Sequence, residues 1–391
     1  MKYKNANSIL PAELIESIQK YVQGEYIYIP IKEKQEPSIP SEYSYELQKR
    51  NAHIYTNSLQ GINNKQLSET YHLSESSIRR ILINQRKRYE IMKNRIKHII
   101  TNWNITNPIF TQIYDTAWQI GNEYILKVYE NPDMLERNIK IITILDNMEI
   151  PTGKIILSKK ETTYIHDDKY YYILLEKMQG SNIVSLKNNL ALAAEMGEIL
   201  ARLHIAFKEC EIQNEFWDNS LLNEMNGWVR NFFQDTGWKY IDEKDFDKTV
   251  LNLKNLYDKL PVQLIHRDVH FGNFLFAQGR FSGYIDFDLS QRNIRIFDLC
   301  YFCIGLLSEE EYMDITKEEW FELLGNVFMG YRRKLALSLE EIQAVPYVME
   351  SIELLFAAWF FGEKDLKCAK DAIELYKFVQ CNEQKIVHSI K

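Results

Sequence analysis

The residues best suited to chemistry lie in two short segments between positions 264 and 288. The first, residues 264–276, carries Asp268 and, five residues later, Asn273. The second, residues 283–288, places Asp286 thirteen residues beyond Asn273. A carboxylate that takes a proton from a hydroxyl, with two hard oxygen ligands for magnesium, is the set of groups that phosphoryl transfer from a nucleotide requires.

Each member of this set has a candidate role. Asp268 is the candidate catalytic base, and Asn273 and Asp286 are the candidate ligands of Mg²⁺. His266 is included among the catalytic candidates as a residue that buttresses the loop rather than one that donates a proton. A single Asp here could equally be a turn residue or a helix cap, so the prediction depends on the combination and its spacing.

The spacing of His266, Asp268, His270 and Asn273 resembles the catalytic loop of the aminoglycoside phosphotransferase family, which is related to the protein kinases. The resemblance covers roughly residues 100–385. It implies a small-molecule kinase that moves the γ-phosphate of ATP or GTP, with Mg²⁺ as cofactor, to a hydroxyl of an acceptor. An aminoglycoside is the acceptor that the resemblance suggests, with antibiotic resistance as the associated role; choline, homoserine, methylthioribose and macrolides stay open.

Two positions depart from the family pattern without removing a functional group. Arg267 stands where the family often has Gly, and Phe271 where it often has Pro. Downstream, Asp298 resembles an Asp that is usually structural in the family. Asp288, two residues beyond Asp286, is either a second acidic contact or a solvated loop residue.

The resemblance also assigns nucleotide-binding residues in the preceding lobe. Lys127, on an apolar strand, resembles the lysine that pairs with the nucleotide phosphates. Glu136, in the following helix, is its candidate ion-pair partner, with Glu130 and Asp133 as competitors.

A second nucleotide-binding segment resembles the hinge between the lobes, where Glu176, Lys177 and Met178 would meet the base. The chain has no G-x-G-x-x-G loop to cover the phosphates. Residues 110–117 are the expected cover, because threonine and backbone N–H groups can bind phosphate without glycine.

The elements that must position these residues follow from the apolar patterns. Residues 104–178 carry the β-branched and aromatic runs typical of strands, interrupted by one helix near 132–148. From residue 191 onward the chain is mainly helical, except for the short apolar segments 263–265 and 281–287.

With the resemblance, this order predicts the α+β class and a bilobal protein-kinase-like fold. A small antiparallel β lobe would span residues 98–180. A larger helical lobe with the catalytic loop and the acceptor pocket would span residues 181–391. A small helical domain with a helix-turn-helix, residues 1–97, would precede both.

The front domain contains a helix, a tight turn and a second helix between positions 64 and 82. Ser74 is the candidate N-cap of the second helix. Ser76, Arg79 and Arg80 would project outward and contact DNA in a major groove. The shared core of the two helices would consist of Leu67, Leu73, Ile78 and Leu82.

This front domain resembles the small helix-turn-helix regulators of the Mor type, as do residues 9–14 and 23–30. DNA is therefore a candidate partner through residues 46–97. Because one helix-turn-helix binds DNA weakly, specific binding would require a homodimer. The alternative is a helical hairpin that packs on the kinase lobes and touches no DNA.

The charge is uneven along the chain. Residues 1–97 carry 16 Lys and Arg against 10 Asp and Glu, a net +6, while the whole chain carries −7, so the remainder carries −13. A basic front and an acidic rear suggest different partners. A second function class therefore stays open: a DNA-binding regulator whose kinase-like domain senses a nucleotide or a metabolite.

Composition indicates a soluble cytoplasmic protein, with 46% apolar and 26% charged residues. There is no run of eighteen apolar residues, so no membrane partner is expected. Five scattered cysteines favour a reducing compartment. Cys300 and Cys303 form a Cys-x-x-Cys, which is either a redox or metal site or, as we expect, two small apolar residues on an apolar helix.

Overall fold

The computed structural model describes Ile15 and the following ranges: 41–59, 61–71, 73–106, 108–114, 116–183, 185–308, 315–363 and 365–391. Chain contacts divide the protein into two units, Met1–Ser38 and Ile39–Lys391. Residues 9–14 and 23–30, which resemble the start of the Mor-type regulators, lie outside the described residues.

Three helices open the described part of the chain: α2 (Ser41–Leu59), α3 (Asn64–Thr70) and α4 (Glu75–Ile99). Asn63 caps α3 in a capping box, and Ser74 caps α4 by accepting a hydrogen bond from a backbone N–H, as predicted.

The core of these three helices is small and apolar. Ile54 of α2, Leu67 of α3 and Ile78 of α4 are fully buried against one another. Leu73 and Leu82 pack against them. All four predicted core residues of the helix-turn-helix therefore lie where the sequence placed them.

The β lobe is a five-stranded antiparallel sheet in the order β1-β2-β3-β5-β4. Its strands are β1 (Phe110–Tyr114), β2 (Ala117–Ile120), β3 (Tyr124–Tyr129), β4 (Ile165–Asp167) and β5 (Tyr170–Glu176). Helix α5 (Pro132–Asn147) follows β3 and starts with Pro132 after an Asn131 cap.

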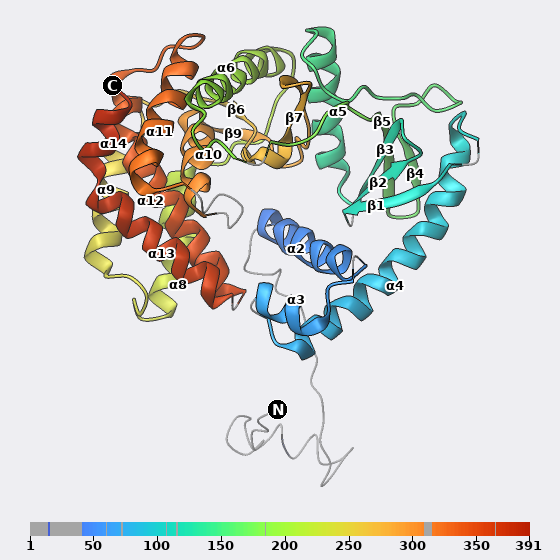
Figure 1. The fold of residues 1–391 in the computed structure, drawn as a ribbon, viewed down its shortest axis with the longest axis horizontal. Helices are drawn as coiled ribbons and strands as arrows, with labels where there is room; N and C mark the ends of the chain where they lie inside the picture. The colour runs from blue at the N-terminus through green and yellow to red at the C-terminus, as the bar shows by residue number, and fades with distance from the viewer. Residues whose placement is uncertain are drawn as a thin grey trace. The chain divides into compact units, whose positions relative to one another are not determined.

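Helix α4 does not end with the front helices but continues into the core of the β lobe (Figure 1). Its last turns and the short helix η2 (Ile100–Asn102) pack against β2, β3 and β5. Tyr89 of α4 also stacks on Trp118 of β2, with ring centroids 5.1 Å apart. The domain boundary expected between residues 97 and 98 thus falls inside a continuous helix.

The remaining elements form the helical lobe. Its helices are α6 (Leu190–Gln213), α7 (Leu221–Glu224), the π-helical turn η3 (Met225–Val229), α8 (Arg230–Asp235), α9 (Glu243–Tyr257), α10 (Ile296–Ser308), α11 (Lys317–Arg332), α12 (Leu339–Gly362), α13 (Leu366–Cys381) and α14 (Glu383–Ser389). Two small antiparallel sheets lie among them: β6 (Val262–Ile265) with β9 (Gln291–Ile294), and β7 (Phe274–Ala277) with β8 (Arg280–Tyr284).

Helix α12 is the centre of this lobe. Among the described residues it is the one helix long and apolar enough to cross a membrane, yet 78% of its most apolar stretch is buried inside the protein. It packs against α9, α10 and α13. We therefore regard it as a core helix.

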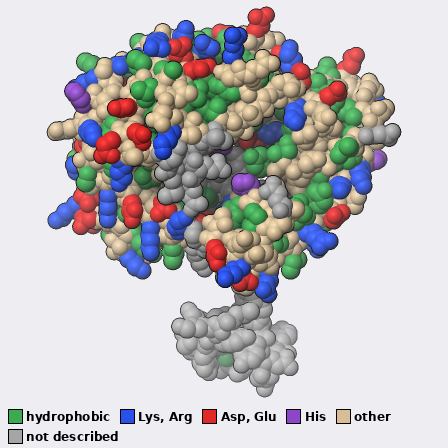
Figure 2. All heavy atoms as spheres, in the orientation of Figure 1, with side chains coloured by type: hydrophobic (Ala, Val, Ile, Leu, Met, Phe, Trp, Pro, Cys, Tyr) green, Lys and Arg blue, Asp and Glu red, His purple; other side chains and the backbone are tan. Residues whose placement is uncertain are grey.

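The acidic excess of the rear half does not gather into one acidic patch on the face drawn in Figure 2. There, Asp and Glu side chains are interspersed with Lys and Arg over the C-terminal helices. Cys300 and Cys303 are fully buried on the apolar helix α10, and burial raises the pKa of both thiols. Their surroundings agree with the apolar interpretation of this pair.

Candidate active site

The two predicted segments are brought together by the hairpin of β7 and β8. In its register Phe274 lies opposite Tyr284, so Asn273 and Ile285 occupy the next positions. The N–H of Ile285 donates to the carbonyl of Asn273 at 3.1 Å. Asp286 therefore comes directly after Ile285, the residue that is hydrogen-bonded to Asn273. The hairpin thus brings Asn273 and Asp286 close together although they are thirteen positions apart in the sequence.

The side chains of Asp268 and Asn273 are hydrogen-bonded to each other. The side-chain nitrogen of Asn273 donates to the backbone carbonyl of Asp268 at 2.8 Å and to its Oδ2 at 3.1 Å. The hydroxyl of Tyr301 lies 3.5 Å from Oδ1 of the same carboxylate. Because the nitrogen of Asn273 is turned toward Asp268, its carboxamide oxygen lies on the opposite side of the group, where it can serve as a hard oxygen ligand.

A third carboxylate fixes the backbone before the base. Asp298 is fully buried and accepts hydrogen bonds from the backbone N–H groups of His266, at 2.8 Å, and Arg267, at 2.9 Å. The Nε2 atom of His204 lies 2.9 Å from the same carboxylate. These contacts agree with the structural role that the resemblance implied for Asp298.

Arg267 adopts a left-handed backbone, with φ of +72°. This conformation explains why glycine is common here in the family, since a side chain at such a position costs about 1 kcal/mol. The guanidinium compensates by donating to the carboxylate of Glu224 at 2.9 Å and by lying 4.3 Å from the ring centroid of Phe297.

His266 lies where a buttress is needed. Its ring is fully buried beside Phe274 and Phe287, and its Nε2 lies 3.2 Å from the carbonyl oxygen of Ile285. Burial lowers the pKa of this histidine, despite the neighbouring carboxylates. A neutral ring therefore ties the Asp268 loop to the Asp286 segment.

Lys127 reaches this centre from the middle of β3. Its Nζ forms ion pairs with Asp286 at 2.9 Å and with Asp288 at 2.8 Å. Burial alone would lower the pKa of Lys127, but the two carboxylates hold it well above the ordinary value. The hydroxyl of Tyr129 donates to Asp288 at 2.8 Å. Asp288 is thus an acidic contact rather than a solvated loop residue.

The ion pair suggested between Lys127 and Glu136 is not the one that the structure forms. Glu136 is exposed on α5, whereas Leu135, Asn138 and Ile142 form the buried face of that helix. Successive residues of an α-helix are rotated by about 100° about its axis, so the side chain of Glu136 points away from the buried face that contains Leu135. The apolar period of α5 carried this information in the sequence.

The predicted hinge segment, residues 176–178, begins at the last residue of β5. The N–H of Glu176 donates to the carbonyl of Lys154 at 2.8 Å, and that of Lys177 to the carbonyl of Glu123 at 2.7 Å. Two of the three predicted hinge amides are therefore engaged within the chain. The predicted phosphate cover, residues 110–117, comprises β1 and reaches the first residue of β2; Asp115 lies outside the described residues.

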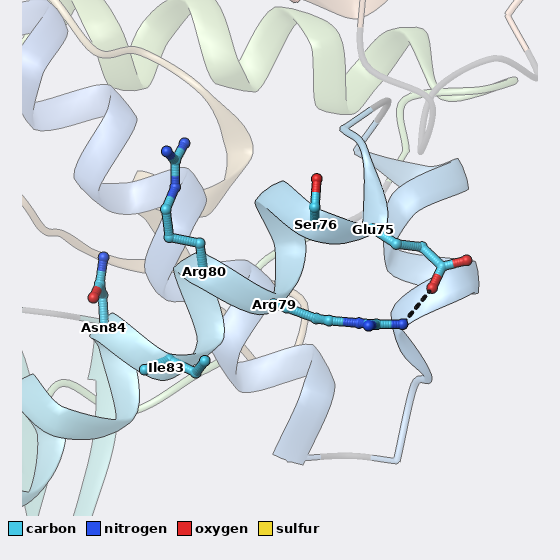
Figure 3. Close-up of a pocket in the computed structure, with 6 residues that line it drawn as sticks. All are labelled: Glu75, Ser76, Arg79, Arg80, Ile83 and Asn84. Atoms are coloured by element: carbon cyan, nitrogen blue, oxygen red, sulfur yellow. Dashed lines mark hydrogen bonds and ion pairs between the residues drawn. The ribbon is translucent and has the colours of Figure 1, made fainter.

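The predicted DNA-contacting residues lie on the exposed face of the first turns of α4, around a hollow of about 420 Å³. Ser76, Arg80 and Asn84 project to one side of the helix, while Arg79 forms an ion pair with Glu75 at 3.2 Å (Figure 3). Ile83, on the same surface, is 69% exposed. The hollow is lined by Glu75, Ser76, Arg79, Arg80, Ile83 and Asn84.

Two curated relatives match parts of the chain. Over 84 residues, 21% of this chain, the identity is 43% with nearly the whole (97%) of the uncharacterized protein YraL of Bacillus subtilis (strain 168). Over 179 residues, 44% of this chain, the identity is 27% with homoserine kinase of Bradyrhizobium sp. (strain BTAi1 / ATCC BAA-1182), of which the chain spans about half (51%).

Solved structures share the fold at low identity. A complex of the amicoumacin kinase hAmiN has a TM-score of 0.57 at 19% identity, covering 77% of this chain and 95% of that one. A microcompartment-associated aminopropanol kinase has 0.55 at 16%, covering 76% and 98%. The GDP complex of aminoglycoside 2′-phosphotransferase-IIIa has 0.51 at 17%, covering 74% and 99%. The kinase-like α+β fold predicted from the sequence is confirmed.

Two family models match different parts of the chain. Residues 3–97 match the model of the Mor transcription activator family. Residues 109–339, more than half of the chain, match that of the phosphotransferase enzyme family. This chain therefore belongs to the phosphotransferase enzyme family.

Proposed function

We propose that this kinase transfers the γ-phosphate of ATP or GTP to a hydroxyl of an amino-group-bearing small molecule, an aminoglycoside or a smaller amino alcohol. One observation carries the proposal: Asp268, Asn273, Asp286 and Lys127 form one connected set. Asn273 donates to Asp268 at 3.1 Å and accepts from the N–H of Ile285, the residue before Asp286, at 3.1 Å, and Lys127 donates to Asp286 at 2.9 Å. The acceptor class follows the names of the matched kinases, whose acceptors include aminopropanol and aminoglycosides.

In the proposed reaction, Asp268 accepts a hydrogen bond from the acceptor hydroxyl. As the new O–P bond forms and the bond to the leaving nucleoside diphosphate breaks, the hydroxyl proton passes to the Asp268 carboxylate. Asn273 at Oδ2 and Tyr301 near Oδ1 orient that carboxylate, so the hydroxyl is held in line with the phosphate.

The oxygens of Asn273 and Asp286 suit Mg²⁺, and they would hold it against the nucleotide phosphates. When bound, Mg²⁺ supplies charge neutralisation to the phosphoryl group in transit. Lys127, an ammonium already set between carboxylates, would bind the phosphates from the β lobe.

The base of the nucleotide would meet the hinge at Met178. Since the amides of Glu176 and Lys177 are engaged within the chain, the amide of Met178 is the hinge donor that we assign to the base.

The test is nucleoside diphosphate release in the presence of Mg²⁺, with ATP or GTP and a panel of aminoglycosides and small amino alcohols. We expect one acceptor class to stimulate release by the wild type and not by Asp268→Asn. Nucleotide binding without stimulation by any acceptor would contradict the proposal and favour a regulator that senses nucleotide.

A second activity, DNA binding, is favoured by the exposed face of α4. Its first turns present Ser76, Arg79 and Arg80, with Arg86, Lys87 and Arg88 one to two turns later, all of them exposed or nearly so. These residue types contact bases and phosphates in a major groove, and a pair of copies would be required for specific binding. Both proposed activities place the protein in the cytoplasm, where nucleotide and DNA are found.

Fluorescence anisotropy with labelled duplex DNA tests this second activity. We expect binding that weakens steeply with salt and is reduced by Arg80→Ala. If the wild type does not bind DNA at low salt, even at high protein concentration, the result would favour a helical hairpin that touches no DNA.

A further inference from the structure

We propose that Asp288 is the positioning residue of Lys127: it holds the ammonium in place while Asp286 serves the metal. This inference rests on the proposed phosphotransfer and deepens it. Kinase-like sites need a carboxylate that keeps the phosphate-binding lysine in register. Here the helix residue expected to do this, Glu136, is exposed, and the carboxylates at Lys127 both come from the segment after β8.

The two carboxylates at Lys127 differ in access. The side chain of Asp286 is 17% exposed, whereas that of Asp288 is 3% exposed. A metal bound with the nucleotide can approach the more open carboxylate and would compete with Lys127 for it. Asp288, closed off from solvent, would then be the anion that stays with the lysine.

Asp288 is itself fixed from both sides. Its Oδ2 lies 2.8 Å from Nζ of Lys127, and its Oδ1 accepts a hydrogen bond of 2.8 Å from the hydroxyl of Tyr129. Lys127 and Tyr129 are two residues apart on β3, so both side chains leave the same face of the sheet. One strand therefore supplies both groups that hold the carboxylate, and their spacing matches its two oxygens.

This arrangement joins the two lobes through the catalytic segment. In the described chain the lysine is tied to the segment that carries a metal ligand, not to α5. The position of α5 would then have little influence on the lysine, and activity would depend on Tyr129 and Asp288 instead. This dependence separates the inference from a helix-based ion pair.

Steady-state kinetics of Asp288→Asn, Asp288→Glu, Tyr129→Phe and Glu136→Gln provide the test, with each variant checked for an unchanged melting temperature. We expect Asp288→Asn to raise the KM for nucleotide at least tenfold and to lower kcat. Asp288→Glu should recover part of the loss, and Tyr129→Phe should show a smaller loss of the same kind. Loss in Glu136→Gln, with Asp288→Asn active, would overturn the inference.

A double-mutant cycle with Lys127→Ala distinguishes positioning from general structural support. If Asp288 acts through Lys127, Asp288→Asn should change the residual rate less than twofold in the Lys127→Ala background. Additive losses would overturn the inference. If the wild type has no kinase activity, the proposed phosphotransfer fails instead. In that case nucleotide affinity measured by calorimetry replaces KM in the same cycle, with the same two outcomes.

Discussion

The catalytic segment and the first turns of α4 represent two different ways of using polar residues. In the catalytic segment, Asp268, Asn273 and Asp298 are buried and each contacts at least two other groups of the chain. On α4, Ser76 and Arg80 are exposed and project from the helix. Buried polar groups depend on one another, so removing one should affect all, whereas exposed groups act nearly independently.

The largest expected effect is at the base. Asp268→Asn keeps the size of the side chain and can still accept the hydrogen bond from Asn273, but it cannot take a proton. We expect kcat to fall by roughly 10³ with little change in the KM for nucleotide, since general base catalysis contributes about 10²–10⁴. Tyr301→Phe, which removes only the more distant contact, should lose less than about tenfold in the same assay.

The next effect concerns Arg267 and stability. Arg267→Gly relieves about 1 kcal/mol of left-handed backbone strain but leaves the buried carboxylate of Glu224 without its guanidinium. Because breaking a buried ion pair costs about 3–5 kcal/mol, we expect a net loss of stability in urea unfolding. Combining it with Glu224→Gln should restore most of the loss; an equally unstable double variant would contradict this account.

Glu353 sharpens the comparison, because it is buried without the partners that Asp298 has. It is 4% exposed and forms no hydrogen bond with any residue that the structure describes. Burial raises its pKa to about 8. A raised carboxyl pKa means that the folded state binds the proton more tightly than the unfolded state, so this residue increasingly destabilises the fold from about pH 4.5 to about pH 8.

Glu353→Gln removes that titration. We expect the variant to gain stability over the wild type as pH rises through this window, by on the order of a few kcal/mol at about 1.4 kcal/mol for each pKa unit. Urea unfolding at several pH values measures the difference. A constant gap between the two proteins from pH 5 to pH 8.5 would show that Glu353 is already ionised without penalty.

The smallest effect is expected on α4. Arg80→Ala should weaken DNA binding by about tenfold and reduce the slope of affinity against salt by about one counterion. Lys97→Ala makes the same charge change near the other end of the same helix and is the matched control. Equal losses in the two variants would mean that charge alone, and not the face of α4, determines binding.

The sequence predicted those parts of the site that lie close together in the chain. The spacing of Asp268, Asn273 and Asp286 reflects one loop and one hairpin, so local pattern was sufficient. The contacts of Lys127 and Tyr129 with Asp288 join distant parts of the chain: Tyr129 and Asp288 are 159 residues apart. No local periodicity carries information about such a contact, so the partners proposed for Lys127 from the sequence were nearby acidic residues, Glu136 with Glu130 and Asp133 as competitors.

The fold shows the same division. Apolar runs predicted the strands and the long helices, and the helix-turn-helix core followed from residues within one short segment. The extension of α4 into the β lobe could not be predicted in this way. Ile96 and Ile99 give the same apolar pattern whether they pack in a front domain or against a sheet. Only the stacking of Tyr89 on Trp118 and the shared core distinguish the two.

That shared helix affects how the gene could change over time. Residues 3–97 match a family model of their own, yet here α4, the last helix of that front domain, supplies part of the core of the β lobe. A deletion that removed the front unit at residue 97 would take Ile96 with it and uncover the sheet behind. When one helix belongs to the cores of two domains, deleting either domain destabilises the other, so both domains tend to be retained together.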